Sequence, residues 1–430
     1  ARWGSAVALA AGASQYMHNY PHVLAGFQGP GVAVEPEIHD FASANGWTIN
    51  NLDLVKHMNA DQAACGYGCS GNPYDAYWAF DPTGHGDVHE LGHGLQGGMR
   101  FVGWVGHSMT NYYSYYTKSK YHLATGGAPE CQSLPFESNF TILQASINQP
   151  DPAAYMQAQL WAGAGWSDQA AMYIELMMAA QADGALQEGW FVRARAHLIE
   201  REFNRATVDE PTWLAKRDSL GFSQYSLAQA DLVDHNDWLL IALSYVLDRD
   251  LRDYLSMWGI PYSATADAQV ASLGFTSLPR QYYVGSADGF CYGLDKPSLP
   301  VDGLQVWPAE TDSDADGMWD AFDNCALTAN PLQEDLDTDS AGDVCDDDID
   351  GDGLVNTDEA TRGTDAYNSD SDGDGYTDGE EVAAGSDPLN PASMPGAIPV
   401  PALGFPALLL LALVMITTGI ARSRRTITNN

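Results

Sequence analysis

The stretch GDVHELGHGLQGGMRFVGWVGHSMTNYYSYY, residues 86–116, combines two histidines at helical spacing with a carboxylate between them. His89 and His93 are four residues apart, so on an α-helix their imidazoles lie one turn apart on the same face and can reach one metal ion. Glu90 follows the first histidine and can reach a water molecule on that metal from the side. We therefore expect this stretch to begin with a zinc-binding helix.

The residue types fit zinc-dependent peptide hydrolysis. Zinc lowers the pKa of a bound water towards about 7 and polarises a carbonyl group. Glu90 is then the expected general base, which takes a proton from the water and passes it to the leaving amine. Two surface histidines on an ordinary helix would share this spacing, but the glycines around the motif and the aromatic run after it favour a metal site.

Three segments in the same order resemble a known family. GDVHELGHGLQ resembles the HExGHxxQ segment of enhancin-type zinc metallopeptidases, which include the immunomodulating metalloproteases and mucin-degrading enzymes of bacteria. HSMTNYYSYY, further on, is similar to the second helix of that family, and DLRDYLSMWGIPYS (250–263) to its closing segment. The resemblance covers roughly residues 60–265. It implies an α+β, gluzincin-like fold that is mostly helical around the site, and cleavage of protein substrates, often O-glycosylated ones such as mucins.

This chain departs from the family at the third zinc ligand. No Asp or Glu occurs between Glu90 and Glu130, and matching Thr110 to the Thr-Asn pair of the family places Ser108 where the family has Glu. Serine is a poor zinc ligand at neutral pH, whereas a neutral imidazole is a good one, and sets of three histidines occur in catalytic sites. We therefore expect His107 to complete the zinc shell.

Other arrangements of this ligand stay open. His107 can instead face solvent or substrate, Glu130 or Glu137 can supply the ligand from further along the chain, or the site can hold two ligands and be inactive.

Four more residues are candidates for supporting roles. Asn111 is expected to orient a zinc ligand through a hydrogen bond. Tyr112, Tyr113 and His235 are candidates to stabilise the tetrahedral oxyanion. An aromatic run on a helix also occurs in protein cores, and a lone histidine is usually structural.

The chain of 430 residues divides into three parts by composition. Residues 1–300 have a mixed composition that is rich in aromatic residues and glycine, and they form the predicted zinc metallopeptidase domain. Helical periodicity covers 152–206 and 236–258, where Pro261 is expected to end the helix. In residues 265–300 apolar and polar residues alternate and turn residues occur, which suggests a small β-rich segment. The start, without an initiator Met or clear signal peptide, is expected to be truncated or processed.

Charge is concentrated in one region. The formal net charge is −38, and 26 of the 57 acidic residues lie between residues 310 and 390, where Arg362 is the only Lys or Arg. An acidic protein of this kind is a poor partner for nucleic acid, because phosphate binding needs a basic surface.

The acidic region repeats the pattern of calcium loops, with Asp at positions 1, 3 and 5, Gly at 6 and a carboxylate at 12. The loops are 312–323, 348–359 and 370–381, and a fourth, 335–346, has Ser340 at position 6. Clustered carboxylates and a glycine for the sharp turn are what Ca²⁺ requires. The predicted calcium ligands are Asp312, Asp314, Asp316, Asp323, Asp335, Asp337, Asp339, Asp346, Asp348, Asp350, Asp352, Glu359, Asp370, Asp372, Asp374 and Glu381.

The segment DNCALTANPLQEDLDTDSAGDVCD (323–346) resembles a thrombospondin type 3 repeat, including its N-P-x-Q and its paired cysteines. The resemblance implies a Cys325–Cys345 disulfide and several structural Ca²⁺ ions in residues 309–393. We expect a calcium-dependent stalk that extends by charge repulsion when calcium is absent. Helix pairs of the EF-hand type are not predicted, and a solvated acidic linker is the alternative.

The six cysteines are scattered, which suits disulfides in an oxidising compartment. Cys65 and Cys69 can close a small loop, and Cys131 can then pair with Cys291. Buried free thiols are the alternative.

Residues 394–430 form the predicted C-terminal signal. The apolar run 402–421 is long enough for one transmembrane helix, and the arginines that follow predict a cytoplasmic C-terminus with the rest of the chain outside. The segment resembles bacterial C-terminal sorting signals, so a sorting enzyme is an expected partner. A plain membrane anchor suits the same residues.

Taken together, these features predict an extracellular zinc metalloendopeptidase with one catalytic zinc, a calcium-bound stalk and a mucin-like glycoprotein substrate. A catalytically inactive cell-surface adhesin on the same stalk is the alternative.

Overall fold

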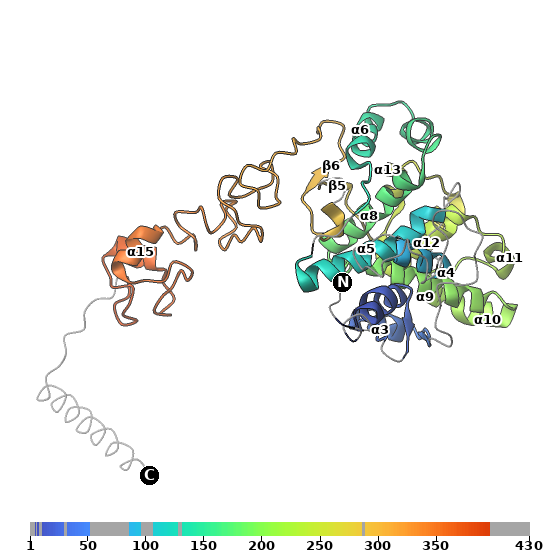
Figure 1. The fold of residues 1–430 in the computed structure, drawn as a ribbon, viewed down its shortest axis with the longest axis horizontal. Helices are drawn as coiled ribbons and strands as arrows, with labels where there is room; N and C mark the ends of the chain where they lie inside the picture. Colours follow the sequence, from blue (N-terminus) through green and yellow to red (C-terminus); the bar gives the residue numbers. More distant parts are fainter. Residues whose placement is uncertain are drawn as a thin grey trace, which may run out of the picture. The chain divides into compact units, whose positions relative to one another are not determined.

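The computed structural model describes residues 5, 7, 11–29, 32–51, 86–95, 106–127, 131–285 and 289–395. These residues belong to two compact units, Ala1–Pro308 and Ala309–Asn430 (Figure 1). Residues beyond the predicted boundary at 300 therefore belong to the first unit. Trp307, for example, packs on Phe140 and Tyr282 with ring centroids 5.6 and 6.1 Å away.

The first unit is mostly helical, with three small sheets among its described residues. Its helices are η1 (Ala13–Asn19), α2 (Tyr20–Leu24), α3 (Pro36–Ala44), α4 (Gly86–Leu95), α5 (Gly106–Thr125), α6 (Phe136–Ile147), α7 (Pro152–Met156), η2 (Gln157–Trp161), α8 (Trp166–Ala182), α9 (Phe191–Ala206), α10 (Glu210–Lys216), η3 (Arg217–Leu220), α11 (Leu227–Ala230), α12 (His235–Leu247), α13 (Arg252–Met257), α14 (Ala264–Leu273) and η4 (Gly289–Cys291). The π-helices are η1 and η2, and the 3₁₀ turns are η3 and η4.

The strands are short, and each sheet described has two of them. β1 (Phe27–Gln28) pairs in parallel with β2 (Asn50–Asn51), β3 (Arg249–Asp250) in parallel with β4 (Thr276–Ser277), and β5 (Gln281–Tyr283) antiparallel with β6 (Ser298–Pro300). The segment 265–300, expected to be β-rich, contains the strands β4, β5 and β6, but the expectation was wrong for its first part, where α14 (Ala264–Leu273) is a helix.

Helix α8 forms the centre of the core. Every residue from Gln169 to Ala180 is buried, so this helix is covered on all sides rather than along one stripe. Helix α5 packs on both α8 and α4 (Figure 1). The side chains of its aromatic run are buried. The site helix α5 is therefore supported by a fully buried stretch of α8, and α4 packs on α5.

The periodic stretch 236–258 is not one helix. Helix α12 ends at Leu247, where Asp248 adopts a left-handed conformation with φ of +52°, and α13 follows after a short strand. Helix α13 ends at Met257, and Gly259 takes φ of +68°. The prediction that Pro261 ends this helix was therefore wrong, because the chain has already turned two residues earlier at a glycine.

A disulfide joins Cys131, ahead of α6, to Cys291 in η4, with Cα atoms 6.1 Å apart. This long-range pairing agrees with the prediction and ties together two segments 160 residues apart. Cys65 and Cys69 lie outside the described residues.

The described part of the second unit, residues 309–395, consists mainly of turns and irregular loops. The Cys325–Cys345 disulfide is present, with Cα atoms 5.7 Å apart. Two short helices begin within the acidic loops: α15 (Asn356–Arg362) and α16 (Asp378–Ala384). Within residues 309–395, neither has a preceding helix of the kind that would complete an EF-hand.

In the part of the chain that the structure describes, none of the helices combines the length and apolar character needed to cross a membrane. The predicted span 402–421 lies outside that part, so the anchor stays a prediction.

Candidate metal centre

A glycine inside the HELGH motif allows α4 and α5 to approach closely. A Cβ atom on Gly92 would lie 2.8 Å from the carbonyl oxygen of Thr110 and 2.7 Å from Cδ2 of Tyr113. Contacts this short do not occur for real Cβ atoms, so any larger residue would push the two helices apart. Gly92 therefore sets the distance between the helix with His89 and His93 and the helix with His107.

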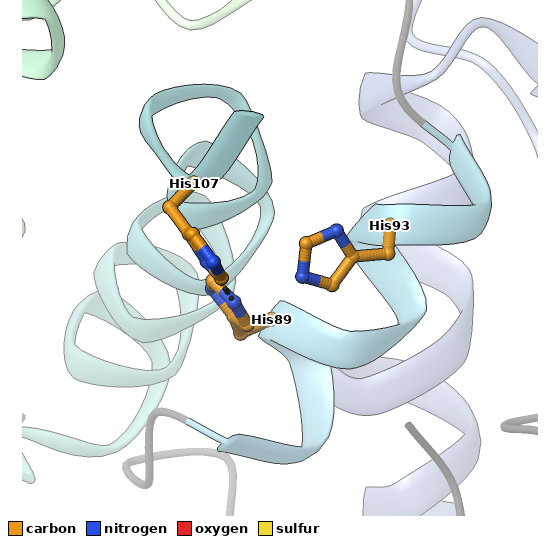
Figure 2. A group of neighbouring side chains, drawn as sticks. All are labelled: His89, His93 and His107. Carbon is orange, nitrogen blue, oxygen red and sulfur yellow. Dashed lines mark hydrogen bonds between the residues drawn. The ribbon is translucent and has the colours of Figure 1, made fainter. Parts of the chain in front are cut away.

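This close packing brings the three predicted histidines together. One ring nitrogen from each of His89, His93 and His107 lies within 4.8 Å of the others. Figure 2 shows the rings of His89 and His93, from α4, converging with the ring of His107 from the start of α5. Nδ1 of His107 lies 3.2 Å from Nε2 of His89, and these two rings stack with an interplanar angle of 6°.

Two residues of α5 fix the orientation of His89. Its Nδ1 lies 2.5 Å from Oδ1 of Asn111 and 3.1 Å from Oγ1 of Thr110. Because an amide oxygen only accepts hydrogen bonds, Nδ1 carries the proton and donates it to Asn111. The lone pair is then on Nε2, which is the nitrogen that faces His107. Thr110 also donates to the carbonyl oxygen of His107, so one side chain contacts both histidines.

The histidines of α4 are held in the neutral form that a metal ligand needs. Burial lowers the pKa of His89 to about 4; the Asn111 hydrogen bond opposes this, while His93 and His107 lower it further. Burial, assisted by His107, also lowers the pKa of His93. Both imidazoles are therefore unprotonated at neutral pH and can donate lone pairs to a cation.

Ser108, which the sequence comparison above matched to the family's Glu, does not face the histidines. It is fully buried, and its hydroxyl donates to Oε1 of Gln169 on α8 at 3.2 Å. Consecutive residues on a helix point about 100° apart, so only one of His107 and Ser108 can face α4. The structure places His107 in that position.

Tyr112 and Tyr113, predicted as candidates to stabilise the oxyanion, lie in the core. Both side chains are fully buried, and burial raises the pKa of each hydroxyl. Tyr112 donates to the carbonyl oxygen of Ala170 at 3.4 Å, and Tyr113 donates to that of Leu95 at 2.7 Å. Both point into the core because α5 is covered by α4 on one side and α8 on the other.

Neither of the remaining described candidates belongs to the cluster of three histidines. His235 is exposed at the start of α12, and Glu137 is exposed in the first turn of α6. The backbone of Glu90 lies in α4, but its side chain and the whole of Glu130 are outside the described residues.

The acidic loops of the second unit also bring carboxylates together. In each of the four loops, the Asp residues at positions 1, 3 and 5 have one oxygen each within 4.8 Å of the others; they are Asp312, Asp314 and Asp316, Asp335, Asp337 and Asp339, Asp348, Asp350 and Asp352, and Asp370, Asp372 and Asp374. The carboxylates at position 12 of the last two loops, Glu359 and Glu381, are fully buried.

Several of these buried oxygens have no hydrogen-bond donor, including Oε2 of Glu359 and both oxygens of Glu381. Burial, with repulsion from nearby carboxylates, raises the pKa of Glu359 to about 7 and that of Asp350 to about 6. Asp323 and Asp346, at position 12 of the first two loops, are close enough to raise the pKa of Asp314 and Asp337. Unpaired buried carboxylates in hard-oxygen clusters are suited to Ca²⁺.

The mostly helical unit with this histidine centre has the fold of a metallopeptidase. Structures of IMPa metallopeptidase from Pseudomonas aeruginosa superpose with TM-scores of 0.60 to 0.61 at 27 to 28% identity, over 71% of this chain and 36% of theirs. One of them holds T-antigen and another an O-glycopeptide.

The chain is homologous to the immunomodulating metalloprotease of Pseudomonas aeruginosa, with 32% identity over 306 residues. The match covers 67% of this chain and 32% of that protein, so the chain spans about a third of its relative. The resemblance to this group of metalloproteases is thus confirmed.

The second unit contains thrombospondin type 3 repeats, as predicted. The thrombospondin type 3 repeat family matches residues 309–333 and 334–359, and the bacterial TSP3 repeat family matches 370–391. Human thrombospondin-3 is 47% identical over 60 residues, which is 11% of this chain and 6% of that protein.

Sequence reasoning missed three residues at the centre. Gly92 was noted only as part of the motif, and neither Thr110 nor Gln169 was considered as a contact of the site. Thr110 lies next to Asn111 on the same predicted helix, so the sequence could have indicated its contact with the site. Gln169 is 61 residues from its partner Ser108, and no local pattern in the sequence predicts that contact.

Proposed function

We propose that this chain is a zinc metallopeptidase that hydrolyses peptide bonds in O-glycosylated protein substrates. The observation that supports this most is the convergence of His89, His93 and His107 on one point between α4 and α5. The homology to a metalloprotease supports the reaction class.

The three side chains fit zinc by their chemistry. Zinc accepts imidazole nitrogens in tetrahedral sites, and a set of three histidines keeps the fourth position open for water or substrate. The proton of His89 is held on Nδ1 by Asn111, which leaves Nε2 for the metal. When bound, zinc would lower the pKa of a water molecule and polarise the scissile carbonyl.

The proton transfers are assigned to Glu90. It directly follows His89 in the sequence of α4. As general base it would accept a proton from the attacking water and deliver it to the nitrogen of the leaving amine. Asn111 and Thr110 would keep His89 oriented during this step.

The substrate class is proposed from the relatives. IMPa has been seen with T-antigen and with an O-glycopeptide, and this chain matches the IMPa fold over 71% of its length. We extend that substrate class, a glycoprotein with short O-linked sugars, to this chain.

We further propose that residues 309–393 form a calcium-stabilised stalk and that the protein works outside the cytoplasm. Two disulfides in the described residues favour an oxidising compartment. The predicted C-terminal helix 402–421, with sorting or anchoring of the chain, belongs to the same proposal.

Hydrolysis of an O-glycosylated mucin distinguishes this function from an inactive adhesin. The full chain with zinc and calcium should release peptide fragments, and a zinc chelator or Glu90→Gln should abolish the release. Glu90→Gln should keep its zinc, because the residue is a base and not a ligand. Binding of mucin without fragments, in a protein shown to contain zinc, would support the adhesin instead.

A further inference from the structure

Helix α5 presents hydrogen-bonding side chains on two of its faces. His107 and Asn111 are four residues apart and therefore lie one turn apart on the same face. Nδ1 of His107 lies 3.2 Å from Nε2 of His89, and Oδ1 of Asn111 accepts the hydrogen bond from Nδ1 of His89 at 2.5 Å. This first face of α5 is thus turned toward α4.

A second face of α5 is bonded to α8. Ser108 and Tyr112 also lie one turn apart, and both side chains are fully buried. The hydroxyl of Ser108 donates to Oε1 of Gln169 at 3.2 Å. The hydroxyl of Tyr112 donates to the carbonyl oxygen of Ala170 at 3.4 Å. Because Gln169 and Ala170 are adjacent residues at the start of the buried stretch of α8, two points on one turn of α5 are fixed to the core.

These contacts set the rotation of α5 about its axis. Consecutive residues of a helix point about 100° apart, so a rotation by one residue would turn Ser108 toward α4 and His107 away from it. That rotation would break the bond from Ser108 to Gln169, and the loss of a hydrogen bond between buried groups is costly. The bond therefore favours His107 over Ser108 as the residue that faces the histidines of α4.

His107 needs such support because it lies at the beginning of α5. It is the second residue of the helix (Figure 2), and its side chain is exposed. The first N–H groups of a helix lack partners within the helix, and helix ends fray easily. Thr110 donates to the carbonyl oxygen of His107 within α5, whereas the Ser108 bond joins this first turn to another helix. Gln169 is 2% exposed, so this anchor is itself held by the core.

We propose that Gln169 is a positioning residue of the metal centre, which acts through Ser108. It holds the first turn of α5 in the rotation that directs His107 toward His89 and His93. Gln169 binds neither metal nor substrate, and it restricts the conformations of His107 before the metal binds. The inference rests on the proposed function for the metal, and it names the contact that selects the third ligand.

The test measures the zinc affinity of the full chain, with calcium present, by competition with a chromophoric chelator. Gln169→Leu keeps the approximate size of the side chain and removes the acceptor. Zinc affinity should therefore fall about 10- to 100-fold, as it does for other residues that orient a metal ligand. Gln169→Glu retains an acceptor oxygen and should recover most of the affinity.

Gln144→Leu is the matched control. Gln144 is a buried glutamine of α6, and it donates to the carbonyl oxygen of Pro300 at 2.8 Å and accepts the amide hydrogen of Gly303 at 2.6 Å. Its replacement should lower the free energy of unfolding, measured in urea, and leave zinc affinity unchanged. An equal loss of zinc affinity in Gln144→Leu and Gln169→Leu would show a general effect of destabilisation and overturn the proposal.

A second readout separates positioning from packing. In a His107→Ala background there is no third histidine to position, so adding Gln169→Leu should not change the residual zinc affinity. Its effect on the free energy of unfolding should be the same with and without His107. A loss of zinc affinity as large in the His107→Ala background as in the parent, or no loss in the parent, would overturn the positioning role. If Gln169→Leu fails to fold, Ser108→Ala removes the same hydrogen bond by a smaller change and is compared in the same two backgrounds.

Mucin hydrolysis by the chain with zinc is measured separately. Zinc affinity that depends on Gln169 in a chain without hydrolysis rejects the peptidase function and retains the positioning role. Hydrolysis together with unchanged zinc affinity in Gln169→Leu rejects the positioning role alone.

Discussion

Asn111 accepts a hydrogen bond from Nδ1 of His89 across 2.5 Å, from one site helix to the other. The bond selects the tautomer of His89 and fixes the rotation of its ring. It therefore determines that Nε2, and not Nδ1, faces the histidines of the centre.

Replacing Asn111 should weaken zinc binding without destroying the fold. Loss of a residue that orients a ligand typically reduces metal affinity by about 10- to 100-fold. We expect Asn111→Ala to show a loss of this size in competition with a chromophoric chelator. Asn111→Asp, which retains an acceptor oxygen, should recover most of the affinity, and an Ala variant that binds zinc as well as the parent would refute the orienting role.

Two glycines of α4 provide a matched pair for the packing of α4 on α5. A Cβ at Gly92 would clash with Thr110 and Tyr113, whereas a Cβ at Gly94 meets nothing within 4 Å. Gly92→Ala should separate the helices and lower both the melting temperature and the zinc affinity. Gly94→Ala should stabilise the helix by up to about 1 kcal/mol, because Ala is the better helix former.

Thermal unfolding followed by circular dichroism, together with zinc titration, measures both variants. Equal behaviour of Gly92→Ala and Gly94→Ala would show that close approach of the helices is not required.

Tyr113 is predicted to be structural. Its hydroxyl donates to Leu95 and lies 2.6 Å from Nε2 of His197 and 3.2 Å from Arg193, in a fully buried network. Tyr113→Phe leaves these groups without their partner and should cost about 1 to 3 kcal/mol of unfolding free energy. The kcat of the folded variant should stay near that of the parent, because loss of an oxyanion donor would instead reduce it about 10²- to 10³-fold.

Calcium binding by the third acidic loop should weaken in mild acid. Burial and neighbouring carboxylates raise the pKa of Glu359 to about 7, above the value for an unfolded chain. In the calcium-free protein this neutral carboxyl stabilises the folded loop at low pH, and that contribution disappears as the pH rises through about 7. Calcium requires the ionised form, so protons compete with it.

We therefore expect calcium affinity at loop 348–359 to be lower at pH 6 than at pH 8, and hydrogen exchange of the calcium-free loop to be slower at pH 6 after correction for the intrinsic rate. Glu359→Gln should bind calcium weakly and show little of this pH dependence. A parent chain with the same affinity at both pH values would contradict the assignment.

The sequence predicted the local parts of the site better than its distant contacts. His89 and His93 share a helix, so their spacing alone places them on one face. The position of His107 depends on how α5 crosses α4, which the close contact at Gly92 determines and which no local pattern reports. Which of His107 and Ser108 faces the other two histidines depends on which helix packs on each side of α5. The sequence alone does not reveal those packing partners.

The aromatic run shows the same limit of prediction from sequence, because residues of a type suited to the site are part of the core instead. Tyr112 and Tyr113 have the residue type of oxyanion donors, yet α5 is buried between α4 and α8, and both hydroxyls bond within the core. In the second unit the repeats are short and local, so the loops and the Cys325–Cys345 pair were predictable from spacing and resemblance.

Zinc content of His107→Ala tests the central claim most directly. His235→Ala is the control, because His235 is exposed and lies outside the three-histidine centre. After dialysis against a weak chelator, the parent and His235→Ala should each retain about one zinc per chain by elemental analysis, and His107→Ala should retain almost none. One zinc in His107→Ala, held as tightly as in the parent, would contradict a site formed by His89, His93 and His107.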